Sequence, residues 1–115
     1  MRTKTQQSAP DAKSDTLTVG NLTIDKTAGR AYVDGFDLSI TKAEFDLLNT
    51  FALNEGKTMN MEEIYDKSWK LPMVLDKRSL QRRISEVRTK LSDGNCSHTI
   101  NNTYGVGYCF EQRGE

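Results

Sequence analysis

The spacing of apolar residues changes at Thr41, and this change divides the chain into three parts. Over residues 17–39, short apolar runs alternate with turn residues such as Asp34 and Gly35, which is typical of antiparallel strands joined by hairpins. Over residues 41–91, apolar residues recur every three or four positions, which is the helical period. A strand-like pattern returns at residues 99–110. This order predicts an α+β chain with about four strands, three helices and a C-terminal hairpin.

Capping residues set the expected limits of the three helices. Thr41 and Glu44 form the sequence pattern of a capping box, and this first helix should stop at Asn54-Glu55-Gly56. Asn60 should cap a second helix over residues 61–69, with acidic residues in its first turn. Asp76 should cap a third helix that ends near Leu91, before Gly94. We expect a short extended piece at residues 57–59 and an irregular loop at residues 70–75.

The third predicted helix combines a narrow apolar stripe with a polar face. Placed at about 100° per residue, the stripe consists of Leu80, Ile84, Val87 and Leu91. The opposite face carries Arg78, Arg82, Ser85 and Thr89, flanked by Gln81, Glu86 and Arg88, while Arg83 and Lys90 lie between the face and the core. Such a face suits the DNA major groove, because Arg pairs with guanine and Gln with adenine. An ordinary solvated face explains the same pattern.

Charge is distributed unevenly although the formal net charge is zero. Residues 76–93 contain six Lys or Arg against three acidic residues, whereas residues 41–68 contain three Lys against six acidic residues. A neutral chain does not by itself favour a nucleic-acid partner, since phosphate contact usually comes with a basic domain. The segment that carries the positive charge is, however, the third helix.

The sequence resembles the effector domains of OmpR/PhoB-type response regulators over residues 17–111. The resemblance rests on LSITKAEFDLL at 38–48, MEEIY at 61–65 followed by Trp69, RSL at 78–80, ISEVRTKL at 84–91 and GVGY at 105–108. It implies a winged helix-turn-helix with a four-stranded N-terminal sheet. The implied function is sequence-specific binding of double-stranded DNA in transcription regulation, as the output domain of a two-component system.

The resemblance also implies where DNA and partners would bind. The helix at 76–91 would enter the major groove and the wing at 99–110 would reach the minor groove. The expected DNA-binding residues are Arg78, Gln81, Arg82, Arg83, Ser85, Glu86, Arg88, Thr89, Asn102, Thr103 and Tyr104. The expected polymerase-contact residues are Lys70, Leu71, Met73 and Val74. Implied partners are direct-repeat DNA half-sites, RNA polymerase and an N-terminal receiver domain, and the chain would be a monomer when free and a tandem homodimer on DNA.

Three positions depart from the family pattern. Glu86 stands where many members carry a base-contacting Arg, and Arg82 stands one turn earlier, where an apolar residue is usual. Tyr104 stands where an Arg often enters the minor groove. A carboxylate accepts a hydrogen bond from cytosine N4 but repels phosphate. Arg82 indicates that the reading charge has moved by one turn, whereas Glu86, Tyr104 and the zero net charge favour the alternative of a winged helix used as a protein-interaction module without DNA readout.

Other classes find little support in the sequence. The single histidine, His98, and the two cysteines, Cys96 and Cys109, lack metal-ligand spacing, and no nucleophile stands beside a base, so we expect no enzyme, metal or cofactor. The polar residues 1–15 are expected to be a flexible linker, residues 16–112 the domain and residues 113–115 a tail. No signal peptide or membrane-length apolar run is visible, which predicts a cytoplasmic location.

Overall fold

The first part of the chain forms an antiparallel sheet of four strands in the order β1-β2-β3-β4. The computed structural model describes residues 15–70 and 76–113. The strands are β1 (Thr16–Val19), β2 (Leu22–Asp25), β3 (Arg30–Val33) and β4 (Phe36–Asp37). Val19, Leu22 and Val33 lie side by side in the strand register and are all buried. One face of the sheet therefore packs against the rest of the molecule, as the alternating pattern predicted.

The fourth strand is shorter than the sequence pattern indicated. The strand-like pattern of the sequence continues to residue 39, but only Phe36 and Asp37 pair with β3. Ser39 adopts a left-handed conformation with φ 57°, and its backbone N–H donates to Asp37 Oδ1 at 2.8 Å. This turn ends the pairing and directs the chain into the first helix.

Three helices follow with the caps that the sequence predicted. They are α1 (Lys42–Leu53), α2 (Met61–Trp69) and α3 (Lys77–Asp93). Both hydrogen bonds of the capping box are present at α1, and the side chains of Asn60 and Asp76 accept from the backbone N–H groups of Glu63 and Ser79. The predicted N-terminal ends of the three helices are confirmed. The helix α3 ends at Asp93, two residues beyond Leu91, where the sequence predicted its C-terminal end.

A second, three-stranded sheet closes the fold in the order β5-β7-β6. Its strands are β5 (Thr58–Met59), β6 (His98–Thr103) and β7 (Gly107–Gln112). The expected hairpin is thus confirmed, and the extended piece before α2 proves to be its third strand, with Met59 opposite Tyr108. A Cβ atom at Gly107 would overlap the carbonyl oxygen of Met59, so β5 and β7 approach closely only because this residue is glycine.

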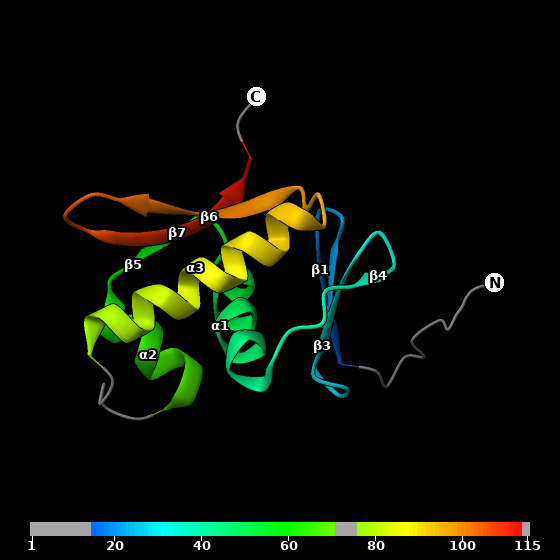
Figure 1. Ribbon diagram of the computed structural model, residues 1–115, viewed down its shortest axis with the longest axis horizontal. Helices are drawn as coiled ribbons and strands as arrows, with labels where there is room; N and C mark the ends of the chain where they lie inside the picture. The colour runs from blue at the N-terminus through cyan, green and yellow to red at the C-terminus, as the bar shows by residue number, and fades with distance from the viewer. Residues whose placement is uncertain (1–14, 71–75, 114–115) are drawn as a thin grey trace.

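The core lies where the three helices meet the two sheets. Leu80, Ile84, Val87 and Leu91 are all buried, which confirms the apolar stripe of α3. Figure 1 shows the N-terminal sheet at one end of the molecule and the hairpin β6–β7 running beside α3 with its tip at the other end. The architecture is the predicted winged helix, and α3 and the hairpin together form one edge of it.

Candidate nucleic-acid interface

The outward side of α3 forms a polar face along the whole helix. Six of the predicted contact residues are exposed on it: Arg78, Gln81, Arg82, Ser85, Glu86 and Thr89. The buried stripe on the opposite side fixes the rotation of the helix, so these side chains can only face solvent or a ligand. Arg83 and Arg88 are half-buried at the two borders of this face.

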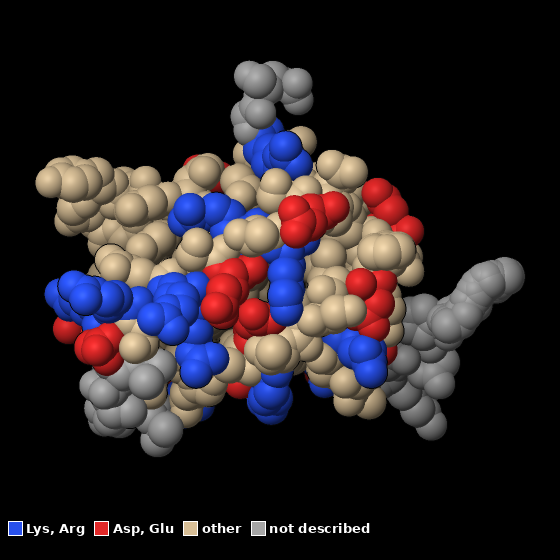
Figure 2. All heavy atoms as spheres, in the orientation of Figure 1, with Lys and Arg blue, Asp and Glu red and all other residues tan. Residues whose placement is uncertain are grey.

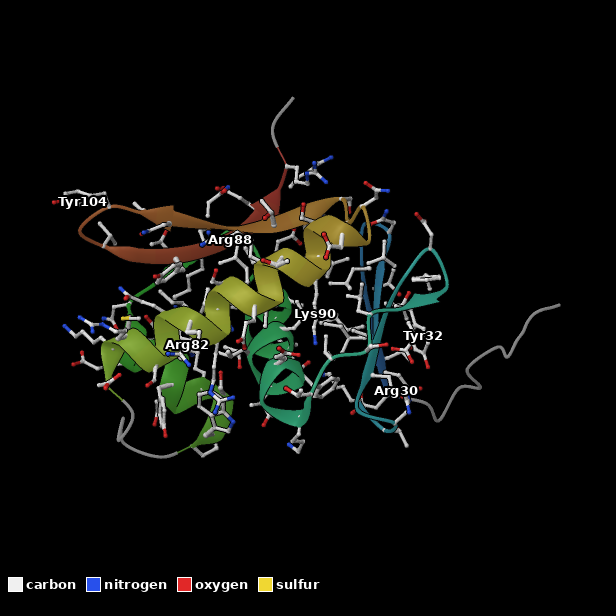
Figure 3. The ribbon with its side chains drawn as sticks, viewed as in Figure 1. Arg30, Tyr32, Arg82, Arg88, Lys90 and Tyr104 are labelled. Carbon is white, nitrogen blue, oxygen red and sulfur yellow. The ribbon has the colours of Figure 1, made fainter. Side chains whose placement is uncertain are left out.

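Positive and negative charge separate along α3. In Figure 2, Lys and Arg side chains gather over the start of the helix, and acidic side chains lie near its middle. Arg82 extends outward from α3 in Figure 3, and Glu86 follows one turn later. The first half of the helix therefore presents the cationic surface that phosphate or guanine edges require.

The second half of α3 is tied to the start of α1. Lys90 Nζ donates to Glu44 Oε1 at 2.7 Å and to the Ser39 carbonyl at 3.0 Å. Burial alone would raise the pKa of the Glu44 carboxyl. The hydrogen bond and charge of Lys90, with the bond from the Thr41 backbone, lower the pKa of Glu44 below its usual value instead. Lys90 therefore forms its hydrogen bonds within the fold, and its charge neutralises that of Glu44.

Arg88 points from α3 toward the hairpin (Figure 3). Its Nε atom is buried, and among the described residues no acceptor lies within hydrogen-bonding distance of it. A buried donor without an acceptor is unfavourable, so the Nε atom of Arg88 contributes no hydrogen bond to the stability of the described fold.

The hairpin that forms the wing ends in an uncharged tip. Gly105, with φ 78°, and the bond from Val106 N–H to the Thr103 carbonyl at 2.9 Å form its turn. Asn102, Thr103 and Tyr104 are exposed, and Tyr104 is 97% exposed. No Lys, Arg, Asp or Glu occurs over residues 101–110. Contacts made by this tip therefore depend on shape and polar groups and not on ionic attraction.

The family model described as "Transcriptional regulatory protein, C terminal" matches residues 35–110. The chain belongs to this family. The match spans all three helices, the whole of β6 and the part of β7 up to Phe110. The resemblance to OmpR/PhoB-type effector domains is thereby confirmed, and the family consists of transcriptional regulators and not of enzymes.

Relatives of this transcriptional regulatory domain are bacterial response regulators. The chain is 34% identical to response regulator ArlR of Staphylococcus epidermidis over 94 residues, which is 82% of this chain and 43% of ArlR. It is 30% identical over 111 residues to the transcriptional regulatory protein SrrA of Staphylococcus aureus, covering 95% of this chain and 46% of SrrA. The chain thus spans about half the length of the curated relatives it matches.

A solved structure shares the fold. The RstA DNA-binding domain of Klebsiella pneumoniae, in complex with the RstA box, superimposes with a TM-score of 0.71 at 26% identity, covering 84% of this chain and 97% of that one. This likeness confirms the predicted winged-helix architecture for the regulatory domain.

The predicted polymerase-contact loop is only partly visible in this regulatory domain. Lys70 is exposed and caps α2 in a left-handed conformation with φ 58°. Leu71, Met73 and Val74 lie outside the described residues. Of the predicted linker and tail, only Asp15 and Arg113 are described.

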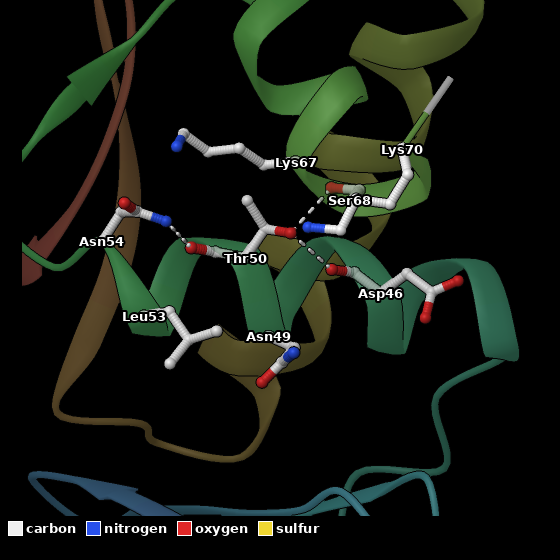
Figure 4. A pocket seen from close by; sticks show the side chains of 8 residues that line it. All are labelled: Asp46, Asn49, Thr50, Leu53, Asn54, Lys67, Ser68 and Lys70. Carbon is white, nitrogen blue, oxygen red and sulfur yellow. Dashed lines mark hydrogen bonds between the residues drawn. The ribbon is translucent and has the colours of Figure 1, made fainter.

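Lys70 borders a polar hollow between α1 and α2 (Figure 4). The hollow is lined by Asp46, Asn49, Thr50, Leu53, Asn54, Lys67, Ser68 and Lys70. The Thr50 hydroxyl donates to the Asp46 carbonyl at 3.0 Å and accepts from the Ser68 hydroxyl at 2.9 Å. The bond from Ser68 to Thr50 joins α2 to α1, whereas the bond from Thr50 to Asp46 lies within α1.

Two exposed residues near the proposed interface were not among the predicted DNA-binding residues. Val106, 58% exposed, lies next to Tyr104 at the wing tip, and Lys77 is exposed in the first turn of α3. Val106 belongs to GVGY at 105–108, where an apolar residue between two glycines has no bulky side chain beside it in the sequence to pack against. The Gly-Val-Gly pattern is therefore the sequence signal that predicts an exposed apolar side chain at Val106.

The two cysteines and the single histidine are buried side chains within the fold. Cys96 and Cys109 are free and buried, and burial raises the pKa of both thiols. His98 is buried against Phe110 and lies 2.6 Å from Glu55 Oε2. Within residues 15–70 and 76–113, no group of three metal-ligating side chains occurs. No helix in that part of the chain has the length and apolarity to cross a membrane.

Proposed function

We propose that this domain binds double-stranded DNA sequence-specifically to regulate transcription, as the output domain of a two-component response regulator. The observation that carries the proposal is the continuous exposed face of Arg78, Arg82, Ser85 and Thr89, held outward by the buried stripe of α3. The RstA domain, whose structure contains its own DNA box, supports this assignment because it shares the fold.

The proposed docking places α3 in the major groove and the hairpin β6–β7 at the minor groove. A major groove about 12 Å wide admits one helix, and Arg78 and Arg82 would read guanine edges with their guanidinium forks. Arg83 and Arg88, at the borders of the face, would contact phosphates. Asn102, Thr103 and Tyr104 would line the minor groove.

The test is a fluorescence-anisotropy titration of the 115-residue chain with a random-sequence duplex at about 50 and about 200 mM salt. Selection from a random library then supplies the preferred duplex. We expect affinity to fall steeply with salt, because each neutralised phosphate contributes about 0.9 to the slope of log K against log salt. We also expect a direct repeat among the selected sequences. A folded chain that binds no duplex at low salt would refute the proposal.

Matched arginine variants locate the interface. Arg82→Ala should abolish specific binding, because Arg82 lies at the centre of the α3 face. Arg30→Ala removes the same charge from the N-terminal sheet, where Arg30 pairs with Asp37 at 2.7 Å (Figure 3), and should leave half-site binding unchanged. An exposed ion pair of this kind contributes at most about 1 kcal/mol to stability.

A protein-interaction module remains the second candidate. The uncharged wing tip with Tyr104 and Val106 favours it, because exposed apolar side chains suit a protein surface. Binding to such a partner would change little with salt, whereas binding to phosphates weakens. Arg82→Ala would also spare a partner that docks on the acidic α1 and α2.

The other partners are part of the same proposal. A receiver domain would precede residue 15, and RNA polymerase would contact the segment that begins at Lys70. Two copies of the domain would bind direct-repeat half-sites in tandem. All of this binding would take place in the cytoplasm. Sedimentation of the chain with and without a duplex of two half-sites tests the tandem dimer. We expect a monomer without DNA and two chains per duplex with it. One chain per two-site duplex at saturation would contradict it.

A further inference from the structure

Glu86 is an exposed carboxylate in the middle of the α3 face that we propose for DNA. No ion pair or hydrogen bond joins its side chain to another residue within the part of the chain that the structure describes. The cation one turn further along the helix, Lys90, is engaged by Glu44 and the Ser39 carbonyl. The negative charge of Glu86 is therefore open toward whatever approaches α3.

The surroundings of Glu86 form a shallow groove beside the start of α1. The groove is lined by Glu44 of α1, by Thr41 that caps this helix, and by six residues of α3: Arg82, Ser85, Glu86, Thr89, Lys90 and Asp93. Acidic side chains lie beside the basic ones on this surface in Figure 2. A phosphate opposite Glu86 would be repelled, so a duplex that docks on α3 must present a hydrogen-bond donor there.

The chemistry of the base edges limits which donor this can be. In the major groove, only cytosine N4 and adenine N6 donate, whereas guanine and thymine present acceptor oxygens or nitrogens. Adenine has its N7 acceptor next to N6, and a carboxylate has no proton to offer it. Cytosine presents N4 without a neighbouring acceptor, so it is the base that suits an ionised Glu86.

We infer that Glu86 is a specificity-determining residue that selects cytosine at one position of the DNA site. The inference rests on the proposed DNA-binding function. It assigns to this chain a base preference of its own, because the contact depends on a carboxylate that lies in the α3 face beside Arg82 but forms no ion pair within the described residues.

The experiment compares base preferences position by position. The chain, Glu86→Ala, Glu86→Gln and a control, Asp66→Asn, are each titrated with the selected duplex and with duplexes in which every base pair of one half-site is replaced in turn. Asp66 is an exposed residue of α2, so the control changes the same charge away from the α3 face. Thermal unfolding followed by circular dichroism verifies that all four proteins fold.

We expect the chain to prefer cytosine by about 5- to 150-fold at one position, which is the discrimination of a good base contact. Glu86→Ala should lose this preference at that position alone and bind random duplexes more tightly, because a repulsive charge is removed. Glu86→Gln should prefer adenine there, because an amide pairs with both N6 and N7. Asp66→Asn should keep the preferences of the unmodified chain.

Other outcomes overturn the inference in distinguishable ways. If Glu86→Ala binds all duplexes more tightly with the same base preferences, Glu86 only repels phosphate and selects no base. If the folded chain binds no duplex, the proposed function fails and the inference fails with it.

Discussion

Lys90 on α3 and Glu44 on α1 form a hydrogen-bonded ion pair of 2.7 Å at the border between the polar face and the core. Glu44 is buried, and its Oε1 also accepts from the Thr41 backbone N–H at 2.8 Å as part of the capping box. One carboxylate therefore completes the start of α1 and fixes α3 against it. This pair therefore adds to the buried apolar stripe in holding the proposed reading helix against α1.

Replacing Lys90 by Met should lower the free energy of unfolding by about 1–3 kcal/mol at about pH 7, because a buried acceptor loses its charged donor. The lowered pKa of Glu44 gives the pH dependence. The ionised Glu44 carboxylate contributes fully to stability when the pH is above the ordinary pKa of a glutamate. This contribution is lost as the pH falls through the lowered pKa that Glu44 has in the folded protein. Urea unfolding at about pH 7 and about pH 3 should show a smaller difference between variant and parent in acid.

Lys42→Met is the control for that comparison. Lys42 is an exposed lysine of α1 that pairs with Asp46 at 2.8 Å. Its removal should cost less than about 0.5 kcal/mol, since exposed pairs one helical turn apart contribute little. An equal loss in both variants would show that Lys90 acts as an ordinary surface cation.

Gly107→Ala should destabilise the wing sheet by about 2–3 kcal/mol, because its Cβ would overlap the Met59 carbonyl and force β5 away from β7. Gly105→Ala is a matched control at the wing turn, where a Cβ meets open space but φ is 78°. That substitution should cost only about 1 kcal/mol of left-handed strain. Urea unfolding of both variants measures the difference, and equal losses would mean that β5 separates from β7 at little cost.

Local signals made the helices predictable from the sequence. The capping residues Thr41, Asn60 and Asp76, and the apolar stripe that begins at Leu80, each depend on residues within a few positions of one another. Helical periodicity also placed Arg78, Arg82 and Thr89 on one face, because a buried stripe determines which side chains point outward.

Contacts between distant segments could not be predicted in the same way. The pairing of β5 with β7 joins residues about fifty positions apart, and the two residues of β5 are too few to show alternation. The pair of Glu44 with Lys90 is equally non-local, so Lys90 could be placed at the border of the core but not assigned a partner. The early end of β4 depends on Ser39, whose left-handed conformation has no strong sequence signal.

Arg88 should contribute to DNA binding and not to stability. Arg88→Met keeps the apolar stem but removes a guanidinium whose Nε has no acceptor among the described residues. We expect unfolding to need as much urea as before or more. The salt slope of DNA binding should fall by about 0.9, which corresponds to one lost phosphate contact, and Arg88→Lys should restore it. An unchanged slope in Arg88→Met would mean that no phosphate contacts this residue.

Tyr104 should contribute to DNA affinity without contributing to its salt dependence. Its side chain is almost fully exposed, so Tyr104→Ala should change the free energy of unfolding by less than about 0.5 kcal/mol. Loss of its contact in the minor groove should weaken binding to the selected duplex by about tenfold, which corresponds to about 1.4 kcal/mol. Because tyrosine is uncharged, anisotropy titrations at several salt concentrations should give the same slope as the parent chain.

Two further variants make the wing prediction specific. Phe36→Ala removes another exposed aromatic ring, 73% exposed, from β4 at the far end of the molecule, and should leave half-site affinity unchanged. Tyr104→Arg should bind more tightly and steepen the salt slope by about 0.9, because it adds a cation to an uncharged wing tip. Unchanged affinity in both Tyr104 variants would mean that the wing does not reach the DNA, and recognition would then depend on α3 alone.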